Sequence, residues 1–209
     1  MIITTRDRAR GIHMSNDLPL SKENILDAAE QVLRRFGPDK TSVVDVAKVL
    51  KVSHGTLYRH FSSKSALREA VTERWLQYNI SEPLKNISEH FDGNAKEQLR
   101  LWMDTLIRSK RTYAVDDAEM FAMYAAVTLE AVDMITLHVD QLIGQIAGII
   151  EKGIQSKEYR VVEPVVTARA IFNATSRYHH PAHAIEWQSA TIDQDFASVW
   201  DLIISGISL

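Results

Sequence analysis

Apolar residues recur along this chain with the period of an α-helix, and no long alternating run predicts a β-strand. The pattern is clear in residues 21–36, where one apolar stripe follows a spacing of three and four residues. Its members are Ile25, Ala28, Ala29, Val32, Leu33 and Phe36. Ser21 stands where an N-cap is expected, and Gly37-Pro38 ends the pattern. We therefore expect an all-α protein whose first helix follows Ser21.

Residues 41–61 predict two short helices joined by a tight turn. Ser42, with Asp45 three residues later, is a helix-start signature, and Ser53 offers a second N-cap. The apolar positions of the first helix are Val43, Val46, Ala47 and Leu50, and the inward anchors of the second are Leu57 and Phe61. The outward positions of the second helix are His54, Gly55, Thr56, Tyr58, Arg59 and His60. Small, aromatic and basic side chains together suit a DNA major groove, although such helix pairs also occur in proteins that never touch DNA.

The residue types in this segment are more specific than their spacing. The chain reads Thr-Ser-Val-Val-Asp-Val-Ala from Thr41, Val-Ser-x-Gly-Thr-Leu-Tyr-Arg-His-Phe from Val52, and Ser-Lys-x-x-Leu from Ser63. This closely resembles the helix-turn-helix of the TetR/AcrR family of transcriptional regulators, over a third of the chain. Two residues depart from the family pattern. Lys51 stands where Gly is frequent, which predicts an unusual backbone angle for a non-glycine residue, and His54 stands where Lys or Pro is common.

The resemblance implies both a function and a set of contacts. It implies a homodimeric repressor that releases palindromic double-stranded operator DNA when a small-molecule effector binds. The base-contact candidates are His54, Gly55 and Thr56. The phosphate-contact candidates are Thr41, Ser53, Tyr58, His60 and Lys64. Phosphate contacts would set register and salt dependence, whereas base contacts would carry the sequence preference.

The rest of the chain also predicts helices. We expect a helix capped by Ser62 or Ser63 that runs to about Ser81, before Pro83. Further helices are expected at 95–113, at 116–153 with a break within 124–128, from Pro164, and from about Asp193. The expected architecture is a flexible tail over residues 1–20, an N-terminal three-helix head with the helix-turn-helix over 21–66, and a C-terminal helical bundle over 67–209. By the resemblance, the bundle binds the effector and dimerises.

Two sets of residues in the bundle are candidates for these roles. A pocket for an apolar or aromatic effector is predicted at Trp102, Met103, Leu106, Met120, Phe121, Tyr124 and Met134. Such residues are more often ordinary core, and no charged residue is singled out as a ligand anchor. A dimer interface on the last two helices is predicted at Ile171, Phe172, Thr175, Phe196, Trp200, Ile203 and Ile207. Composition alone does not decide between this interface and a monomer core.

Charge and composition narrow the class of protein. Residues 1–70 carry 12 Lys and Arg against 8 Asp and Glu, whereas residues 71–209 carry 12 against 19. A basic front on an acidic remainder is typical of a DNA-binding head on a separate body, although the excess is modest. The chain has no cysteine, which excludes thiol catalysis and thiolate metal sites. No apolar run approaches the roughly 18 residues that span a membrane, and we expect a cytoplasmic protein without a cofactor.

Two alternatives stay open. His179, His180 and His183, with Glu186, could bind a transition metal and would then favour an enzyme or a metal-binding protein. The spacing matches no strong zinc signature, and no nucleophile–base pair or paired-carboxylate motif accompanies it, so a loop with surface or pH-sensitive histidines is the simpler interpretation. The other alternative keeps DNA binding but makes the body a dimerisation block without an effector.

Overall fold

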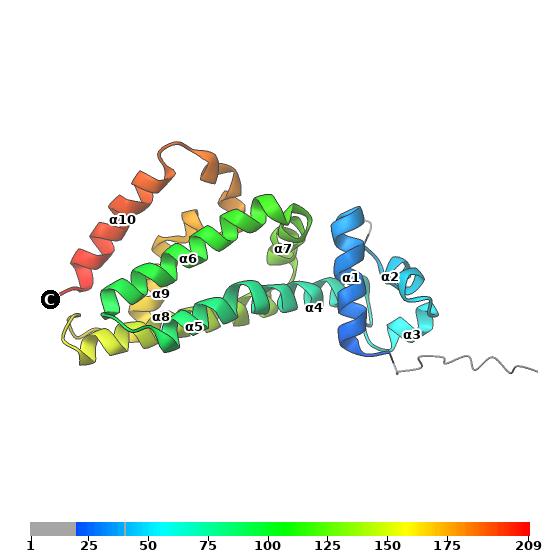
Figure 1. The fold of residues 1–209 in the computed structure, drawn as a ribbon, viewed down its shortest axis with the longest axis horizontal. Coiled ribbons are helices and arrows are strands. Elements are labelled where there is room, and N and C mark those ends of the chain that lie inside the picture. The colour runs from blue at the N-terminus through cyan, green and yellow to red at the C-terminus, as the bar shows by residue number, and fades with distance from the viewer. Residues whose placement is uncertain (1–19, 40) are drawn as a thin grey trace, which may run out of the picture.

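The computed structural model describes residues 20–39 and 41–209, and it confirms an all-helical protein with a small head and a larger body (Figure 1). The head holds α1 (Lys22–Phe36), α2 (Val43–Leu50) and α3 (His54–Tyr58). The body holds α4 (Lys64–Leu76), the π-helical turn η1 (Gln77–Ser81), α5 (Glu82–His90), α6 (Ala95–Asp116), α7 (Ala118–Glu130), α8 (Val132–Gln155), α9 (Pro164–Ala174), the short 3₁₀ segments η2 (Ser176–Tyr178) and η3 (Pro181–Gln188), and α10 (Ile192–Ile207). The predicted tail over residues 1–20 lies outside the described residues except for Leu20.

Serine side chains begin the three head helices and α4, as the sequence predicts. The accepting hydroxyls and the donating backbone N–H groups are Ser21 with Asn24, Ser42 with Asp45, Ser53 with Thr56, and Ser63 with Ala66. Each cap satisfies a backbone donor that has no partner within its own helix. Lys51 ends α2 in the left-handed region, at φ 55° and ψ 39°, which confirms the unusual backbone angle expected at the turn.

Pro83 does not end the helix that starts at Lys64, and this prediction was wrong. The chain passes through η1 and continues as α5, with Pro83 in the first turn of α5. A proline is tolerated there because the first-turn N–H groups need no partner within the helix. In the wider π-helical turn, the Asn79 side chain donates to the Trp75 carbonyl (2.9 Å) and satisfies that acceptor.

The predicted break at residues 124–128 was also misplaced, since α7 continues to Glu130. The chain turns at Ala131, whose φ of −109° and ψ of 65° are not helical. The axes of α7 and α8 then differ by 107°. No glycine or proline lies between residues 124 and 131, so the position of the turn is set by packing and has no local signature.

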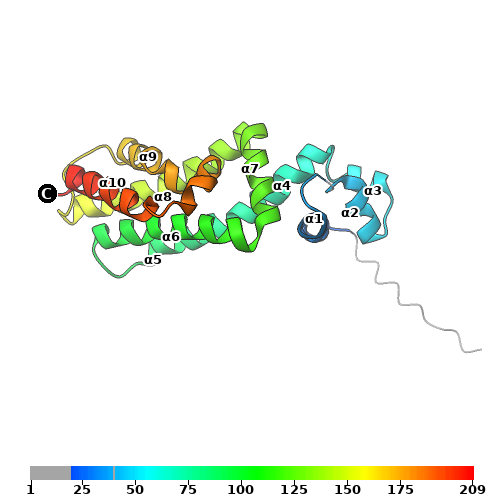
Figure 2. The ribbon, with the colours of Figure 1, turned by 90° about the horizontal axis from the view of Figure 1, so that it is seen from above.

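The body is a bundle built around α8, which packs against α5, α6 and α9 (Figures 1 and 2). The short helix α7 closes the end of the bundle nearest the head and contacts α1, α4 and α6. One cluster of buried apolar residues runs through head and body. No single helix of the described chain combines the length and hydropathy of a membrane span; α7 and α8 reach these only as a bent pair.

Candidate DNA-binding surface and body cavity

The outward surface of α3 is held in place by two buried anchors. Leu57 (1% exposed) and Phe61 (4% exposed) pack into the head core, as predicted. The α3 helix is only five residues long, so its stability depends on these anchors and on the Ser53 cap rather than on helix propensity. This arrangement presents the residues between the anchors and the cap to solvent.

Seven of the eight predicted DNA contacts lie on or beside this outward surface of α3. Ser53, His54, Gly55, Tyr58, His60 and Lys64 are exposed, and Thr56 is partly exposed. The Thr56 hydroxyl lies 2.9 Å from the Ser53 hydroxyl. Arg59 Nη2 donates to the Thr56 hydroxyl at 3.5 Å. Arg59 is exposed on the same surface and was absent from the predicted contacts, although its position between Tyr58 and His60 in the outward set could have indicated it.

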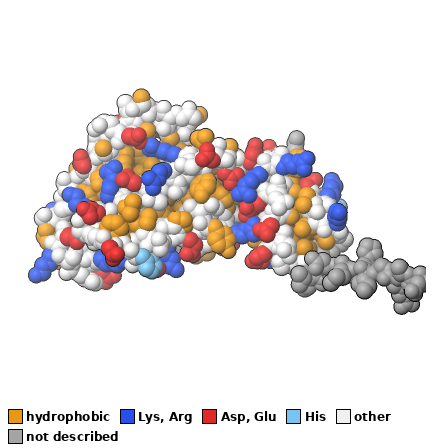
Figure 3. Space-filling model, viewed as in Figure 1, with side chains coloured by type: hydrophobic (Ala, Val, Ile, Leu, Met, Phe, Trp, Pro, Cys, Tyr) orange, Lys and Arg blue, Asp and Glu red, His pale blue; other side chains and the backbone are white. Residues whose placement is uncertain are grey.

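Thr41 is the exception. Its side chain is 1% exposed, and its hydroxyl donates to the Gly37 carbonyl at 2.9 Å. The side chain is therefore not offered to a phosphate, because it braces the loop between α1 and α2. Lys64 Nζ donates to the Asp39 carbonyl at 3.1 Å, which places this ammonium beside the same loop while leaving it exposed. Figure 3 shows Lys and Arg side chains at the outer end of the head, away from the body.

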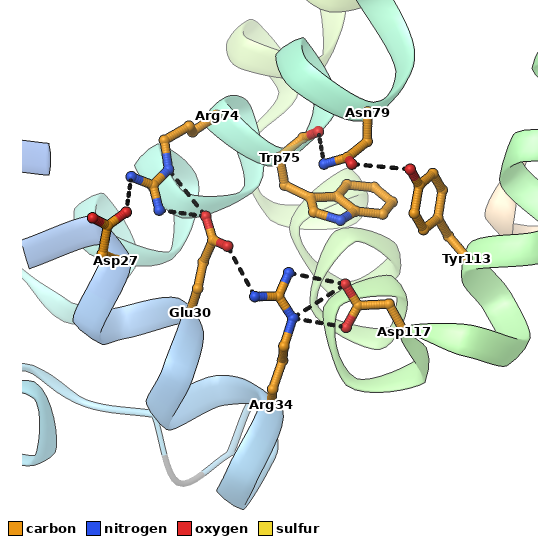
Figure 4. Close-up of polar contacts among 8 residues, drawn as sticks. All are labelled: Asp27, Glu30, Arg34, Arg74, Trp75, Asn79, Tyr113 and Asp117. Atoms are coloured by element: carbon orange, nitrogen blue, oxygen red, sulfur yellow. Dashed lines mark hydrogen bonds and ion pairs between the residues drawn. The ribbon is translucent and has the colours of Figure 1, made fainter.

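Ion pairs join the head to the body at α1 (Figure 4). Arg74 of α4 donates to Asp27 (2.8 Å) and Glu30 (3.0 Å), both on α1. Arg34 of α1 donates to Glu30 (3.1 Å) and to Asp117 (3.1 Å), which lies at the joint between α6 and α7. The bond to Asp117 is the main cause that raises the pKa of Arg34. The orientation of the head is thus tied both to α4 and to the end of the bundle.

Aromatic contacts continue from this junction into the body. The ring of Trp75, on α4, lies 5.2 Å from that of Tyr113 on α6 and 5.8 Å from that of Tyr124 on α7, measured between centroids. Tyr113 also donates its hydroxyl proton to the Asn79 side chain (2.9 Å). Tyr124 in turn forms part of the wall of an internal cavity. Packed aromatic side chains therefore connect α4, the helix that follows the head, to the cavity.

The cavity lies between α6, α7, α8 and the end of α9, and its volume is about 60 Å³. It is lined by Leu106, Lys110, Tyr124, Thr128, Ile135, His138, Val139, Leu142, Phe172, His179 and His180. Of the seven predicted pocket residues, Leu106 and Tyr124 line it. Phe121 lines a separate open groove, of about 310 Å³, beside η3. Trp102, Met103 and Met120 are buried in the core and Met134 is partly buried, so sequence pattern did not separate wall residues from core.

Lys110 is the charged residue of this cavity, and the sequence pattern did not single it out. It is 2% exposed, and its ammonium lies 3.9 Å from the centroid of the Tyr124 ring. Burial lowers its pKa from 10.5 to about 7. A signal was present, because Lys110 falls four residues after Leu106 and seven after Met103, and so continues the apolar stripe of α6.

The histidine cluster is dispersed by the fold. His179 is buried and lies beside the Thr175 hydroxyl (Nε2 to Oγ1, 3.3 Å), and burial lowers its pKa to about 3. His183 instead pairs with Glu186 at 2.6 Å near the surface. Within the described residues, no group of three or more His, Asp or Glu side chains could hold a metal ion. The geometry gives the metal-binding alternative no support.

The predicted dimer-interface residues face the interior of the protomer. Ile203 is partly buried, and the other six are at most 9% exposed. These six are Ile171, Phe172, Thr175, Phe196, Trp200 and Ile207. The stripe of large side chains on each helix packs against its own bundle, so an interface between protomers on these helices stays a prediction and would use their other faces. The opposite faces of α9 and α10 are exposed, and they carry Val165 (56%), Val166 (69%) and Leu202 (75%).

A helix-turn-helix head on a helical body defines a class of DNA-binding regulators, and family models identify which one. The model of bacterial regulatory proteins of the tetR family matches residues 25–71, and that of the tetracyclin repressor-like C-terminal domain matches residues 95–200. The chain therefore belongs to the TetR family, whose members are transcriptional regulators and not enzymes.

Curated relatives match part of the chain. The uncharacterized HTH-type transcriptional regulator YvdT of Bacillus subtilis is 40% identical over 60 residues, which is 29% of this chain and 31% of that protein. An HTH-type transcriptional regulator of Staphylococcus aureus (strain USA300) is 31% identical over 97 residues, or 46% of this chain and 51% of that protein. The chain thus aligns with about a third to a half of the length of these relatives.

Solved structures share the whole fold. SmeT, the repressor of the Stenotrophomonas maltophilia multidrug efflux pump SmeDEF, superposes with a TM-score of 0.65 at 19% identity, over 91% of both chains. The regulator FadR from Bacillus subtilis, in complex with stearoyl-CoA, gives a TM-score of 0.61 at 22% identity, over 90% of this chain and all of that one. At these identities the likeness shows a common fold of head and body.

Proposed function

We propose that this protein is a homodimeric repressor that binds palindromic operator DNA in the cytoplasm and releases it when a small apolar or aromatic effector enters the body. The exposed surface from Ser53 to Lys64 is the observation that carries the DNA-binding part of this proposal. It combines donors, acceptors and cations on α3, whose apolar side is buried in the head, and on the residues that follow it up to the start of α4. A helix with this surface fits the major groove, with its flanking cations against the phosphates.

Selection of bound sequences from random double-stranded DNA tests this part directly, followed by fluorescence anisotropy with the selected duplex. His54→Ala or Thr56→Ala should relax discrimination at one base position by about 1–3 kcal/mol. Lys64→Ala should weaken binding to all sequences and reduce the salt slope by about one. Lys85→Ala, which removes an exposed lysine from α5, is the matched control and should change neither. Failure to retain any duplex at low salt would refute DNA binding.

Dimerisation is proposed through the exposed faces of α9 and α10. A repressor that reads two half-sites needs two heads spaced to meet successive major grooves, about 34 Å or a multiple apart. Leu202→Asp or Val166→Asp should place a charge in this contact and yield monomers in light scattering, with weaker operator binding. Leu129→Asp makes the same change at an equally exposed leucine (80%) on α7, near the head, and should leave the dimer intact. Dimers that persist in both interface variants would move the interface elsewhere.

Effector release is proposed to act through α7. This helix carries Tyr124 in the cavity wall, contacts α4 through Trp75, and meets α1 beside the pair of Arg34 and Asp117. A ligand that displaces α7 would disturb both connections to the head. The FadR complex shows that a protein of this fold can accommodate a ligand.

Reciprocity gives the test for this coupling. A compound that raises the melting temperature by binding the folded protein should also lower the affinity for the operator. The operator should in turn lower the affinity of the protein for the compound by the same factor. Compounds that bind the body without changing DNA affinity would favour the alternative in which the body only dimerises.

A further inference from the structure

Lys110 is a buried cation with no anion beside it. None of the cavity-lining residues that the structure describes carries a carboxylate, and within residues 20–39 and 41–209 no atom accepts a hydrogen bond from Lys110 Nζ. The ammonium lies over the face of the Tyr124 ring, 3.9 Å from its centroid. A buried ammonium normally has a paired charge or several acceptors, because removing it from water is costly. Lys110 therefore lines the cavity with an ammonium that has no hydrogen-bond acceptor among the described residues.

We propose that this cavity binds a small organic acid, whose carboxylate pairs with Lys110 and whose apolar part contacts Ile135, Val139 and Leu142. This inference rests on the proposed function in taking the body as the effector-binding part, and it names the chemical class of the effector. A carboxylate satisfies two donors of an ammonium with short, charge-assisted hydrogen bonds, and the remaining walls accept hydrocarbon.

The neighbouring titratable groups favour a single negative charge on the ligand. The groups that face Lys110 are Tyr124 of α7, His138 of α8, and His179 and His180 after α9. Burial lowers the pKa of His138 and of His179 to about 3, so both imidazoles are neutral at physiological pH. Burial raises the pKa of Tyr124, so its phenol is neutral too. Lys110 thus supplies the positive charge of the cavity, and a monoanion neutralises it.

Binding should be linked to proton uptake. The pKa of Lys110 is about 7 because burial penalises its charged form. A bound carboxylate favours the ammonium and raises that pKa, so above pH 7 the complex takes up a proton that the ligand-free protein lacks. The apparent affinity for an acid should fall as the pH rises from about 7 to 9, whereas a neutral ligand in the same cavity would show no such dependence.

The size of the cavity connects this site to α7. A volume of about 60 Å³ holds only a few heavy atoms, whereas established ligand pockets are roughly 300–1,000 Å³. An acid larger than acetate must therefore push the walls apart. Tyr124 forms one wall and its ring also packs against Trp75 of α4, so the displaced wall includes a contact with the helix that enters the head.

Calorimetry of the full chain without DNA tests the proposal. The probes are butyrate, benzoate and octanoate, each paired with its neutral amide, and titrations are run at pH 7 and 8.5 in buffers of different ionisation enthalpy. At least one acid should bind about tenfold to a hundredfold more tightly than its amide. This ratio corresponds to the binding free energy that a hydrogen bond to a charged group contributes. Lys110→Met should remove this preference, whereas Lys96→Met, at an exposed position of the same helix, should preserve it. Buffer-dependent heats at pH 8.5 should report proton uptake.

Three results would overturn the inference: no acid binding up to millimolar concentration, equal binding of acid and amide, or an acid preference that survives Lys110→Met. If Lys110→Met does not fold, the acid–amide comparison and the proton uptake of the unaltered protein still decide. Anisotropy with the operator is measured separately. Lys110-dependent acid binding that leaves DNA affinity unchanged supports the site and counts against effector release, while release by neutral compounds alone supports the function and counts against the site.

Discussion

Replacing Lys110 by methionine should stabilise the ligand-free protein by an amount that depends on pH. Burial lowers the pKa of Lys110 from 10.5 to about 7, so between these values the unfolded chain binds a proton that the folded protein does not. The free energy of unfolding therefore rises with pH in this window, and the penalty for burying the ammonium is fully present below pH 7. At about 1.4 kcal/mol for each pH unit, the full penalty is about 5 kcal/mol, of which about 4 kcal/mol remains at pH 7.

Urea denaturation of both proteins between about pH 7.5 and 9.5 measures this effect. Over that range the unaltered protein should gain about 2.5 kcal/mol relative to Lys110→Met, because its lysine becomes progressively neutral in the folded state. The range lies above the titration of His138 and His179, whose pKa values are about 3, so those imidazoles do not contribute to the slope. Methionine suits this site because its side chain is unbranched and flexible like that of lysine, but apolar and uncharged.

Parallel stability curves for the two proteins would refute the reasoning, since they would show that Lys110 keeps an ordinary pKa and is solvated or paired. Lys96→Met, which removes an exposed lysine from the same helix, should leave both the stability and its pH dependence close to those of the unaltered protein.

Three further predictions concern the head and are checked by urea denaturation. Lys51→Gly should stabilise the protein by about 1 kcal/mol, because φ is 55° at this position, and a loss of stability would show that the lysine side chain contributes more than the backbone. Gly37→Ala should destabilise by at least about 1 kcal/mol, because φ is 81° and a side chain is strained there; the Glu119 carboxylate, 2.9 Å from the new Cβ, is exposed and can turn aside, so no change would mean that the backbone at residue 37 relaxes readily. Ser53→Ala should remove the α3 cap and cost about 1 kcal/mol, with Ser53→Thr as the variant that retains it.

The head could be predicted from the sequence nearly residue by residue. Its cap serines and its anchors Leu57 and Phe61 depend on interactions within a few positions along the chain, whereas the left-handed Lys51 was expected from the family resemblance. Local hydrogen bonding and helical periodicity therefore suffice to place the serines and the anchors. Thr41 was misassigned because its partner, the Gly37 carbonyl, depends on the path of a loop.

The body was less predictable, because its features depend on packing between distant segments. The stripe of α6 showed that Leu106 is buried, but not whether it faces solid core or a cavity. The stripes of α9 and α10 were recognised correctly as apolar faces, yet the choice between the core and a partner subunit needed the positions of the other helices. Periodicity identifies a face and cannot say what covers it.

By itself the sequence determined the helical class, the division into head and body, the family, and the outward surface of α3, since each is written in local spacing and side-chain chemistry. Only the tertiary structure decided that Lys110 is enclosed with neutral neighbours and that α7 joins the cavity to the head. Burial and charge pairing arise between segments far apart in the chain, and they are properties of the folded arrangement rather than of any one helix.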